Sequence, residues 1–155
     1  ELMHYRRETM QKIFDEIQAN GLISELEDLF TGRDYLQVVH QGTIKPDDTV
    51  LMFSIDSAQL YEMKQSDVWI YIYMVFDLSP CLRYKKAAIL PGGIIPGPNP
   101  PKNVDSFLFH GLQHLAALQK EGFPVWDAKQ DKIVMNRLFL MFAAADGPGL
   151  AHING

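Results

Sequence analysis

Residues 49–56 read TVLMFSID, a run of β-branched, aliphatic and aromatic side chains that ends at an aspartate. Residues 138–146 read LFLMFAAAD, a continuous apolar run that ends in the same way. Both runs have the length and composition of β-strands. If the second strand pairs parallel beside the first, Asp56 and Asp146 lie at the same edge of the sheet.

Between these runs, residues 68–78 show the alternation of a strand. Aromatic side chains at Trp69, Tyr71 and Tyr73 alternate with aliphatic ones, which indicates a strand covered on both faces. Ser79-Pro80 ends it. A third strand is expected at residues 84–90, before a loop of glycine and proline at residues 91–101.

Residues 104–121 have the spacing of a helix, with Asn103 as a candidate N-cap and Gly122 as the terminating residue. Its predicted buried stripe consists of Leu108, Leu112, Leu115 and Leu118. A short strand is possible at residues 123–126. Because a strand reached through a helix pairs parallel by a right-handed crossover, the predicted fold class is α/β, a mixed sheet with helices able to cover both faces.

The N-terminal part predicts a helical hairpin that packs on the main domain. Residues 3–19 are amphipathic and Asn20-Gly21 supply a stop. A second short helix is expected at residues 22–30, ended by Thr31-Gly32. We therefore divide the chain into an N-terminal helical segment, residues 1–46, and a core, residues 47–155.

Composition limits the classes of protein that need to be considered. Of the 155 residues, 47% are hydrophobic and 21% charged, which is ordinary for a globular protein and argues against disorder. The net charge of −5 does not favour nucleic-acid binding, which normally rests on a basic surface. The longest apolar runs, of about 11 residues, are too short for a membrane helix. The single cysteine, Cys81, indicates a reducing compartment. Since the chain opens at Glu1 and has no closing element, we expect a piece of a longer protein.

Asp56 and Asp146 are the candidates for chemistry. Two carboxylates at one sheet edge suit Mg²⁺, which prefers hard oxygen ligands and keeps positions for water and phosphate. The alternative is that both aspartates are turn formers after strands. His110 and His114 have helical i, i+4 spacing but no third ligand nearby, so a surface or packing role is favoured. Cys81 lacks a partner base, and Asp127 is interpreted as a turn or capping residue, with support of the site as the alternative.

Several stretches, in order, carry a resemblance to a known family. They are SIDSAQLY at 54–61, SDVWIY at 66–71, LSPCLRYK at 78–85, the loop from Leu90 to Pro101, the helix from Asp105 to Gly122 and ADGPG at 145–149. DLFTG at 28–32 is similar to a stretch that precedes the core in the same family. Together they resemble the CACTA-type (En/Spm-like) DNA transposases, in particular the fungal branch.

The resemblance implies a ribonuclease-H-like fold with a DDE/D triad and two divalent ions, Mg²⁺ or Mn²⁺. Asp56 matches the first acid and Asp146 the second, and both would be metal ligands; the third acid would lie beyond Gly155, which leaves the core incomplete at its C-terminus. Ser57 stands where the family typically has glycine. The implied activity is metal-dependent cleavage and strand transfer at transposon ends, by an oligomer in the nucleus. We expect this chain to be inactive alone, and the alternative is a catalytically inactive, transposon-derived interaction module that keeps the fold.

Overall fold

A computed structural model describes residues 2–23, 28–59, 67–97 and 101–146. Its elements, in chain order, are α1 (Tyr5–Asn20), α2 (Arg33–His40), β1 (Thr49–Gln59), β2 (Asp67–Val75), α3 (Pro80–Arg83), β3 (Ile89–Pro96), α4 (Asp105–Glu121), β4 (Phe123–Asp127), β5 (Lys132–Asn136) and β6 (Leu138–Ala145). Short 3₁₀ turns occupy Leu2–His4, Leu29–Thr31 and Lys86–Ala88. The motif residues 60, 61, 66, 98–100 and 147–149 lie outside the described residues.

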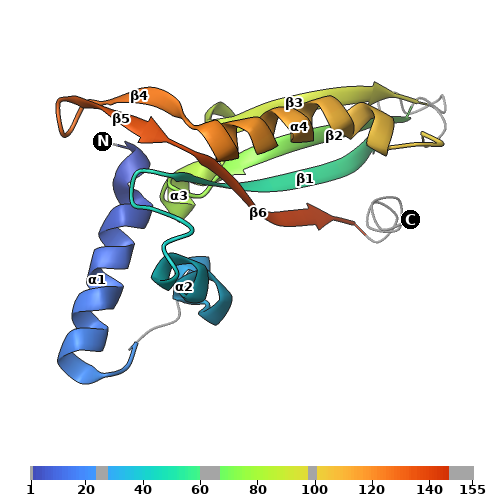
Figure 1. Cartoon of the computed structure of the whole chain (residues 1–155). Helices are drawn as coiled ribbons and strands as arrows, with labels where there is room; N and C mark the ends of the chain where they lie inside the picture. The colour runs from blue at the N-terminus through green and yellow to red at the C-terminus, as the bar shows by residue number, and fades with distance from the viewer. Residues whose placement is uncertain (1, 24–27, 60–66, 98–100, 147–155) are drawn as a thin grey trace.

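Four strands form one mixed sheet in the order β3-β2-β1-β6 (Figure 1). β1 pairs antiparallel with β2, and β2 antiparallel with β3. β6, reached through α4, pairs parallel with β1. The predicted mixed α/β sheet is therefore confirmed, and so is the parallel pairing on which the meeting of the two aspartates depends.

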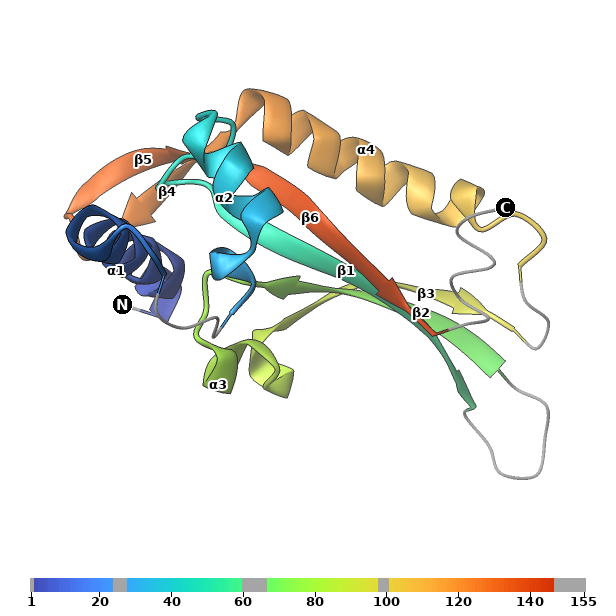
Figure 2. The same cartoon turned by 90° about the horizontal axis from the view of Figure 1, so that it is seen from below.

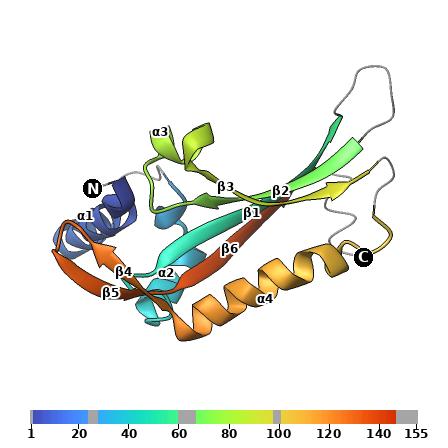
Figure 3. The ribbon, with the colours of Figure 1, turned by 90° about the horizontal axis from the view of Figure 1, so that it is seen from above.

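Helices lie on both faces of this sheet (Figures 2 and 3). On one face, Val104 and Leu108 at the start of α4 pack on Phe53, Ile55, Trp69, Tyr71 and Ile95. On the other face, α1 and α2 contribute Met10, Ile13 and Tyr35 to a cluster with Val50, Met74 and Phe139. Trp69 and Tyr71 thus face one layer and Met74 the other, as the alternation in β2 predicts. No described helix is long and apolar enough to cross a membrane.

The third strand lies further along the chain than expected. Residues 84–88 form a turn and a 3₁₀ turn after α3, and β3 begins only at Ile89 and runs through the first part of the predicted glycine–proline loop. β3 is at the edge of the sheet, where proline is tolerated because one side of the strand needs no ladder hydrogen bonds. Its glycines are required by packing, since a Cβ at Gly93 would lie 2.7 Å from the Tyr71 hydroxyl.

The second helix of the N-terminal hairpin was also misplaced. Gly21 ends α1 in the left-handed conformation, with φ 70°, as predicted. The described part of residues 22–30, however, contains only the start of the 3₁₀ turn at Leu29–Thr31, and the helix is α2. The Asp28 carboxylate accepts a hydrogen bond from the Leu29 amide, which fixes a turn where the apolar spacing suggested a helix. Residues 24–27 lie outside the described residues.

α4 has the predicted bounds, but its leucine stripe is only partly covered. Leu108 is buried, Leu115 and Leu118 are half-buried, and Leu112 is exposed. The Asn103 side chain accepts a hydrogen bond from the Ser106 amide at the start of α4, and Gly122 adopts a φ of 72° after its end. The short strand expected at residues 123–126 is β4, which pairs with β5 in a separate two-stranded sheet.

Candidate functional site

Asp56 and Asp146 occupy corresponding positions on neighbouring parallel strands. The parallel register runs to the pair Ile55 and Ala145, so each aspartate follows its strand's last paired residue by one position. Neighbouring strands of a sheet lie about 4.8 Å apart, so the backbones of the two aspartates are close to each other. Ile55 and Ala145 both pack in the cluster under α4, and side chains alternate along a strand. The two aspartates therefore belong to the sheet face opposite α4.

Asp56 differs in its surroundings from the buried aspartates Asp48, Asp77 and Asp127. Asp56 is exposed, and one of its carboxylate oxygens accepts a 2.8 Å hydrogen bond from the Ser57 amide. β1 continues past Asp56 to Gln59, with Ser57 opposite Trp69 on β2. Ser57 thus sits in regular extended backbone, where a side chain is accommodated without strain.

Two carboxylates supply the oxygen ligands that a divalent cation prefers, so their chemistry fits a partial Mg²⁺ or Mn²⁺ site. Within the described residues, no group of three or more His, Cys, Asp or Glu side chains could hold a metal ion. A third ligand for a site at Asp56 and Asp146 would have to come from outside the described residues.

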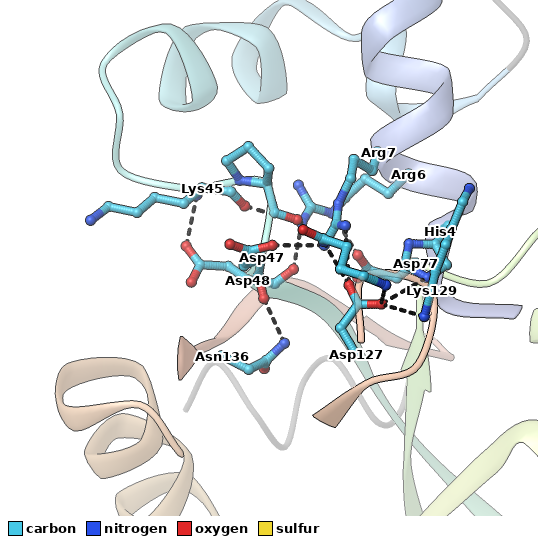
Figure 4. A network of polar contacts seen from close by, with 12 residues as sticks. His4, Arg6, Arg7, Lys45, Asp47, Asp48, Asp77, Asp127, Lys129 and Asn136 are labelled. Carbon is cyan, nitrogen blue, oxygen red and sulfur yellow. Dashed lines mark hydrogen bonds and ion pairs between the residues drawn. The ribbon is translucent and has the colours of Figure 1, made fainter. Parts of the chain in front are cut away.

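A second polar centre, which sequence reasoning missed, lies at the other end of β1 (Figure 4). Asp127, at the end of β4, is buried; its carboxylate lies 3.5 Å from the His4 ring and forms an ion pair with Arg7 at 3.3 Å. Its carboxylate also accepts hydrogen bonds from the Lys129 and Gln130 amides and from the Gln130 side chain. Burial raises the pKa of Asp127, but these hydrogen bonds outweigh it and hold the pKa at about 2.

Asp127 joins the hairpin of β4 and β5 to the N-terminal helix. It caps the turn after β4, which confirms the turn role predicted for it, and it also contacts residues more than a hundred positions earlier in the chain. Lys129 reinforces the same junction by a 2.8 Å ion pair with Glu8. No local pattern in the sequence predicts these long-range contacts.

Beside this junction the structure contains a cavity of ≈ 470 Å³. It lies between the starts of α1 and β1 and the β4–β5 hairpin, and its walls include Arg7, Asp47, Leu51, Trp126 and Asn136. Thr49, which also lines it, precedes Asp56 by seven residues of β1, or about 23 Å of strand. The cavity and the paired aspartates are therefore separate sites.

Comparison with protein-family models matches residues 50–155 to the model described as "Transposase family tnp2". The chain belongs to this transposase family. The match covers β1 through β6, and hence both Asp56 and Asp146. The curated proteins and the solved structures that were compared give no match.

Two arginines of this transposase-family chain, Arg6 and Arg83, are buried and paired inside the protein. Arg6 is 2% exposed, forms a 2.7 Å ion pair with Asp77 and donates to the carbonyl oxygens of Lys45, Pro46 and Asp48. Arg83 is equally buried; it pairs with Asp28 at 2.8 Å and lies over the Phe76 ring. Arg6 and Arg83 thus hold the fold together and are not available to DNA.

The remaining candidates in the transposase chain have the surface roles predicted for them. His110 and His114 are exposed on α4, where His110 makes an edge contact with the Phe109 ring. Cys81 is exposed and lies 3.1 Å from the Ser79 hydroxyl. Gly92 and Gly93 belong to β3, which corrects the interpretation of this segment as a connecting loop.

Proposed function

We propose that this chain supplies the first two metal-binding carboxylates, Asp56 and Asp146, of a cut-and-paste DNA transposase of the CACTA type, fungal branch. The observation that carries the proposal is the parallel register of β1 and β6, which brings the two acids side by side. Membership of the tnp2 transposase family supports it, because the matched segment contains both residues.

The strand arrangement is in keeping with a ribonuclease-H-like core. Three antiparallel strands follow one another as β1, β2 and β3, and the next strand of the same sheet, β6, returns parallel to β1 through α4. In such a core the first acid lies on the first strand and the second acid follows the fourth. In the proposed assignment Asp56 and Asp146 correspond to these two acids.

In the proposed enzyme the exposed carboxylates of Asp56 and Asp146 hold Mg²⁺ or Mn²⁺, together with a third acid from outside the described residues. When bound, a pair of such ions activates the attacking hydroxyl and stabilises the leaving oxygen of an in-line displacement. The protein's own part is to keep the two carboxylates together. It does so through the β1–β6 ladder, and the Ser57 amide orients the Asp56 carboxylate.

The substrate in this proposal is the DNA of transposon ends, cleaved and joined by an oligomer in the nucleus. The second candidate is a catalytically inactive, transposon-derived interaction module. The burial of Arg6 and Arg83 and the net charge of −5 favour it, because both reduce the basic surface available to DNA. The two candidates differ in whether the aspartates bind metal.

Titration with MgCl₂ or MnCl₂, followed by NMR of the backbone amides, tests the proposal. We expect shifts, or broadening by Mn²⁺, centred on Asp56, Ser57 and Asp146, weak in affinity because only two acids contribute. Asp56→Asn and Asp146→Asn should each abolish the effect. The matched control is Asp131→Asn, because Asp131 is an exposed acid outside the site and its φ of 53° suits asparagine.

Absence of any metal effect at Asp56 and Asp146 would contradict the metal site and leave the interaction module as the better description. The chain alone is expected not to cleave DNA. Divalent-dependent nicking by the purified chain that is lost in Asp56→Asn would show that two acids suffice, against this expectation.

A further inference from the structure

The cavity between α1, the start of β1 and the β4–β5 hairpin has the properties of a ligand site. Its volume of ≈ 470 Å³ falls within the range of about 300–1,000 Å³ typical of small-molecule pockets. Much of its wall is apolar, formed by Leu51, Val75, Leu90, Val125, Val134 and Leu138. Neither the family match nor the proposed chemistry at Asp56 and Asp146 assigns it a role.

The charged groups of the wall indicate the sign of the ligand. Four aspartates line the cavity, namely Asp47, Asp48, Asp77 and Asp127, together with two basic residues, His4 and Arg7. Arg6 lies behind the wall, bound to Asp77. Even with both arginines and His4 counted as positive, the four aspartates leave negative charge in excess. Phosphate and other anions are therefore disfavoured here, and a cation is favoured.

The hydrogen-bonding groups of the wall point in the same direction, because acceptors outnumber donors. Among the described residues, one carboxylate oxygen of Asp47 accepts a hydrogen bond from the Arg7 side chain. One carboxylate oxygen of Asp48 accepts a hydrogen bond from the Lys45 amide. The second oxygen of each has no hydrogen bond in the described part of the chain. A ligand that donates hydrogen bonds would satisfy these acceptors.

Asn136 fixes the wall of the cavity at the start of β1. Its Nδ2 donates to the Asp47 carbonyl at 2.7 Å and to the Thr49 hydroxyl at 2.9 Å, which fixes the orientation of the amide because a carbonyl can only accept. Its Oδ1 is buried and is therefore not offered to a ligand in the cavity. Asn136 acts by holding the backbone of Asp47 in place.

Trp126 supplies an aromatic surface at the same place. It lines the cavity and is nevertheless 57% exposed, and it comes from the hairpin that Asp127 anchors to α1. The face of an indole ring attracts cations and planar cationic groups. The chain's other tryptophan, Trp69, is buried in the sheet and offers no such surface.

We propose that this cavity binds a small organic cation, an apolar body that carries an amidinium, guanidinium or amine head. The head donates hydrogen bonds to the acceptors of Asp47 and Asp48, and the body packs against the leucine and valine wall and the Trp126 ring. The proposal is independent of the transposase chemistry, because none of its residues belongs to the Asp56 and Asp146 site.

Three compounds of similar shape test which sign of charge the cavity prefers in a ligand. Benzamidine is cationic, benzamide is neutral and benzoate is anionic. Binding is followed in the whole chain by NMR, at the indole N–H of Trp126 with that of Trp69 as internal reference. We expect benzamidine to bind at least about 10-fold more tightly than benzamide, as a charge-assisted hydrogen bond to a carboxylate should, and benzoate most weakly. Shifts confined to Trp126 support the site.

Asp47→Asn removes one charge at the partly exposed edge of the cavity and should weaken benzamidine about 5-fold or more, with little effect on benzamide. Asp131→Asn removes an equal charge from the same hairpin region, outside the cavity wall, and should leave both affinities unchanged. Equal binding of all three compounds, tightest binding of benzoate, or no shift at Trp126 would each overturn the proposal.

Discussion

Replacing Arg6 by methionine tests whether a buried ion pair fastens the N-terminal helix to the sheet. The Arg6 guanidinium donates to the Asp77 carboxylate at 2.7 Å, to the Tyr35 hydroxyl at 3.3 Å and to three carbonyl oxygens before β1. Methionine fills most of the volume but leaves the Asp77 carboxylate buried without its counter-ion. We expect the free energy of unfolding to fall by about 3–5 kcal/mol, the usual cost of breaking a buried pair.

The pH dependence of that loss follows from Asp77. Burial already raises the pKa of Asp77, while Arg6 and the hydrogen bond from the Val50 amide oppose the rise. Without Arg6 the pKa rises further, so the folded protein binds a proton that the unfolded chain releases. Stability of the variant should therefore be highest below the unfolded pKa and decline as pH rises through the folded pKa.

Urea unfolding followed by circular dichroism at pH 5 and pH 8 measures both effects. Arg7→Met is the matched control: its ion pairs with Asp47 and Asp127 involve a side chain that is 32% exposed, and a loss of about 1 kcal/mol or less is expected. In a double-mutant cycle, Asp77→Asn should recover part of the Arg6→Met loss. A loss below about 1 kcal/mol in Arg6→Met, or strict additivity with Asp77→Asn, would refute the reasoning.

Two further predictions concern β3 and Asp127. Gly93→Ala places a Cβ 2.7 Å from the Tyr71 hydroxyl and should lower the free energy of unfolding by about 1–3 kcal/mol, measured by urea unfolding. The control is Gly111→Ala, whose Cβ would lie 3.3 Å from the Tyr73 hydroxyl and which should cost little because alanine favours the helix. Equal losses in the two variants would contradict the packing argument. Because the pKa of Asp127 is about 2, below the ordinary 3.8, its ionised form stabilises the fold fully above pH ~4, and that contribution is lost as pH falls toward 2. In Asp127→Asn the loss of stability between pH ~4 and pH 2, followed by fluorescence, should be smaller than in the unsubstituted chain. An unchanged loss would mean that other carboxylates cause it.

The elements that the sequence predicts well are those whose signal is local. β1 and β6 begin as apolar runs of strand length, β2 alternates aromatic and aliphatic side chains, and α4 has an apolar stripe, a polar residue before its start and Gly122 after its end. The pairing of β1 with β6 followed from one rule, the right-handed crossover through a helix. These few elements suffice to bring Asp56 and Asp146 together.

Where prediction failed, the deciding interaction was distant in sequence. Glycine and proline at residues 91–96 indicate a loop locally, yet the Tyr71 ring requires glycine there and the edge position tolerates proline. In the same way, Arg83 and Asp28 are separated by 55 positions, and their ion pair helps to fix the turn at Leu29–Thr31. A single sequence contains no local pattern for such contacts.

The surroundings of several aspartates of this chain differ in a way that bears on function. Asp28, Asp77 and Asp127 are held by arginine and by amide donors within the protein, so their oxygens already serve the fold. Asp56 is exposed, and its hydrogen bond in the described structure comes only from the adjacent Ser57 amide. A carboxylate committed to fixed donors cannot readily change partners, whereas one placed at a sheet edge beside a second acid can take up a cation. Their exposed positions at the ends of neighbouring parallel strands, more than the presence of acids in the sequence, single out Asp56 and Asp146 for the test by metal titration.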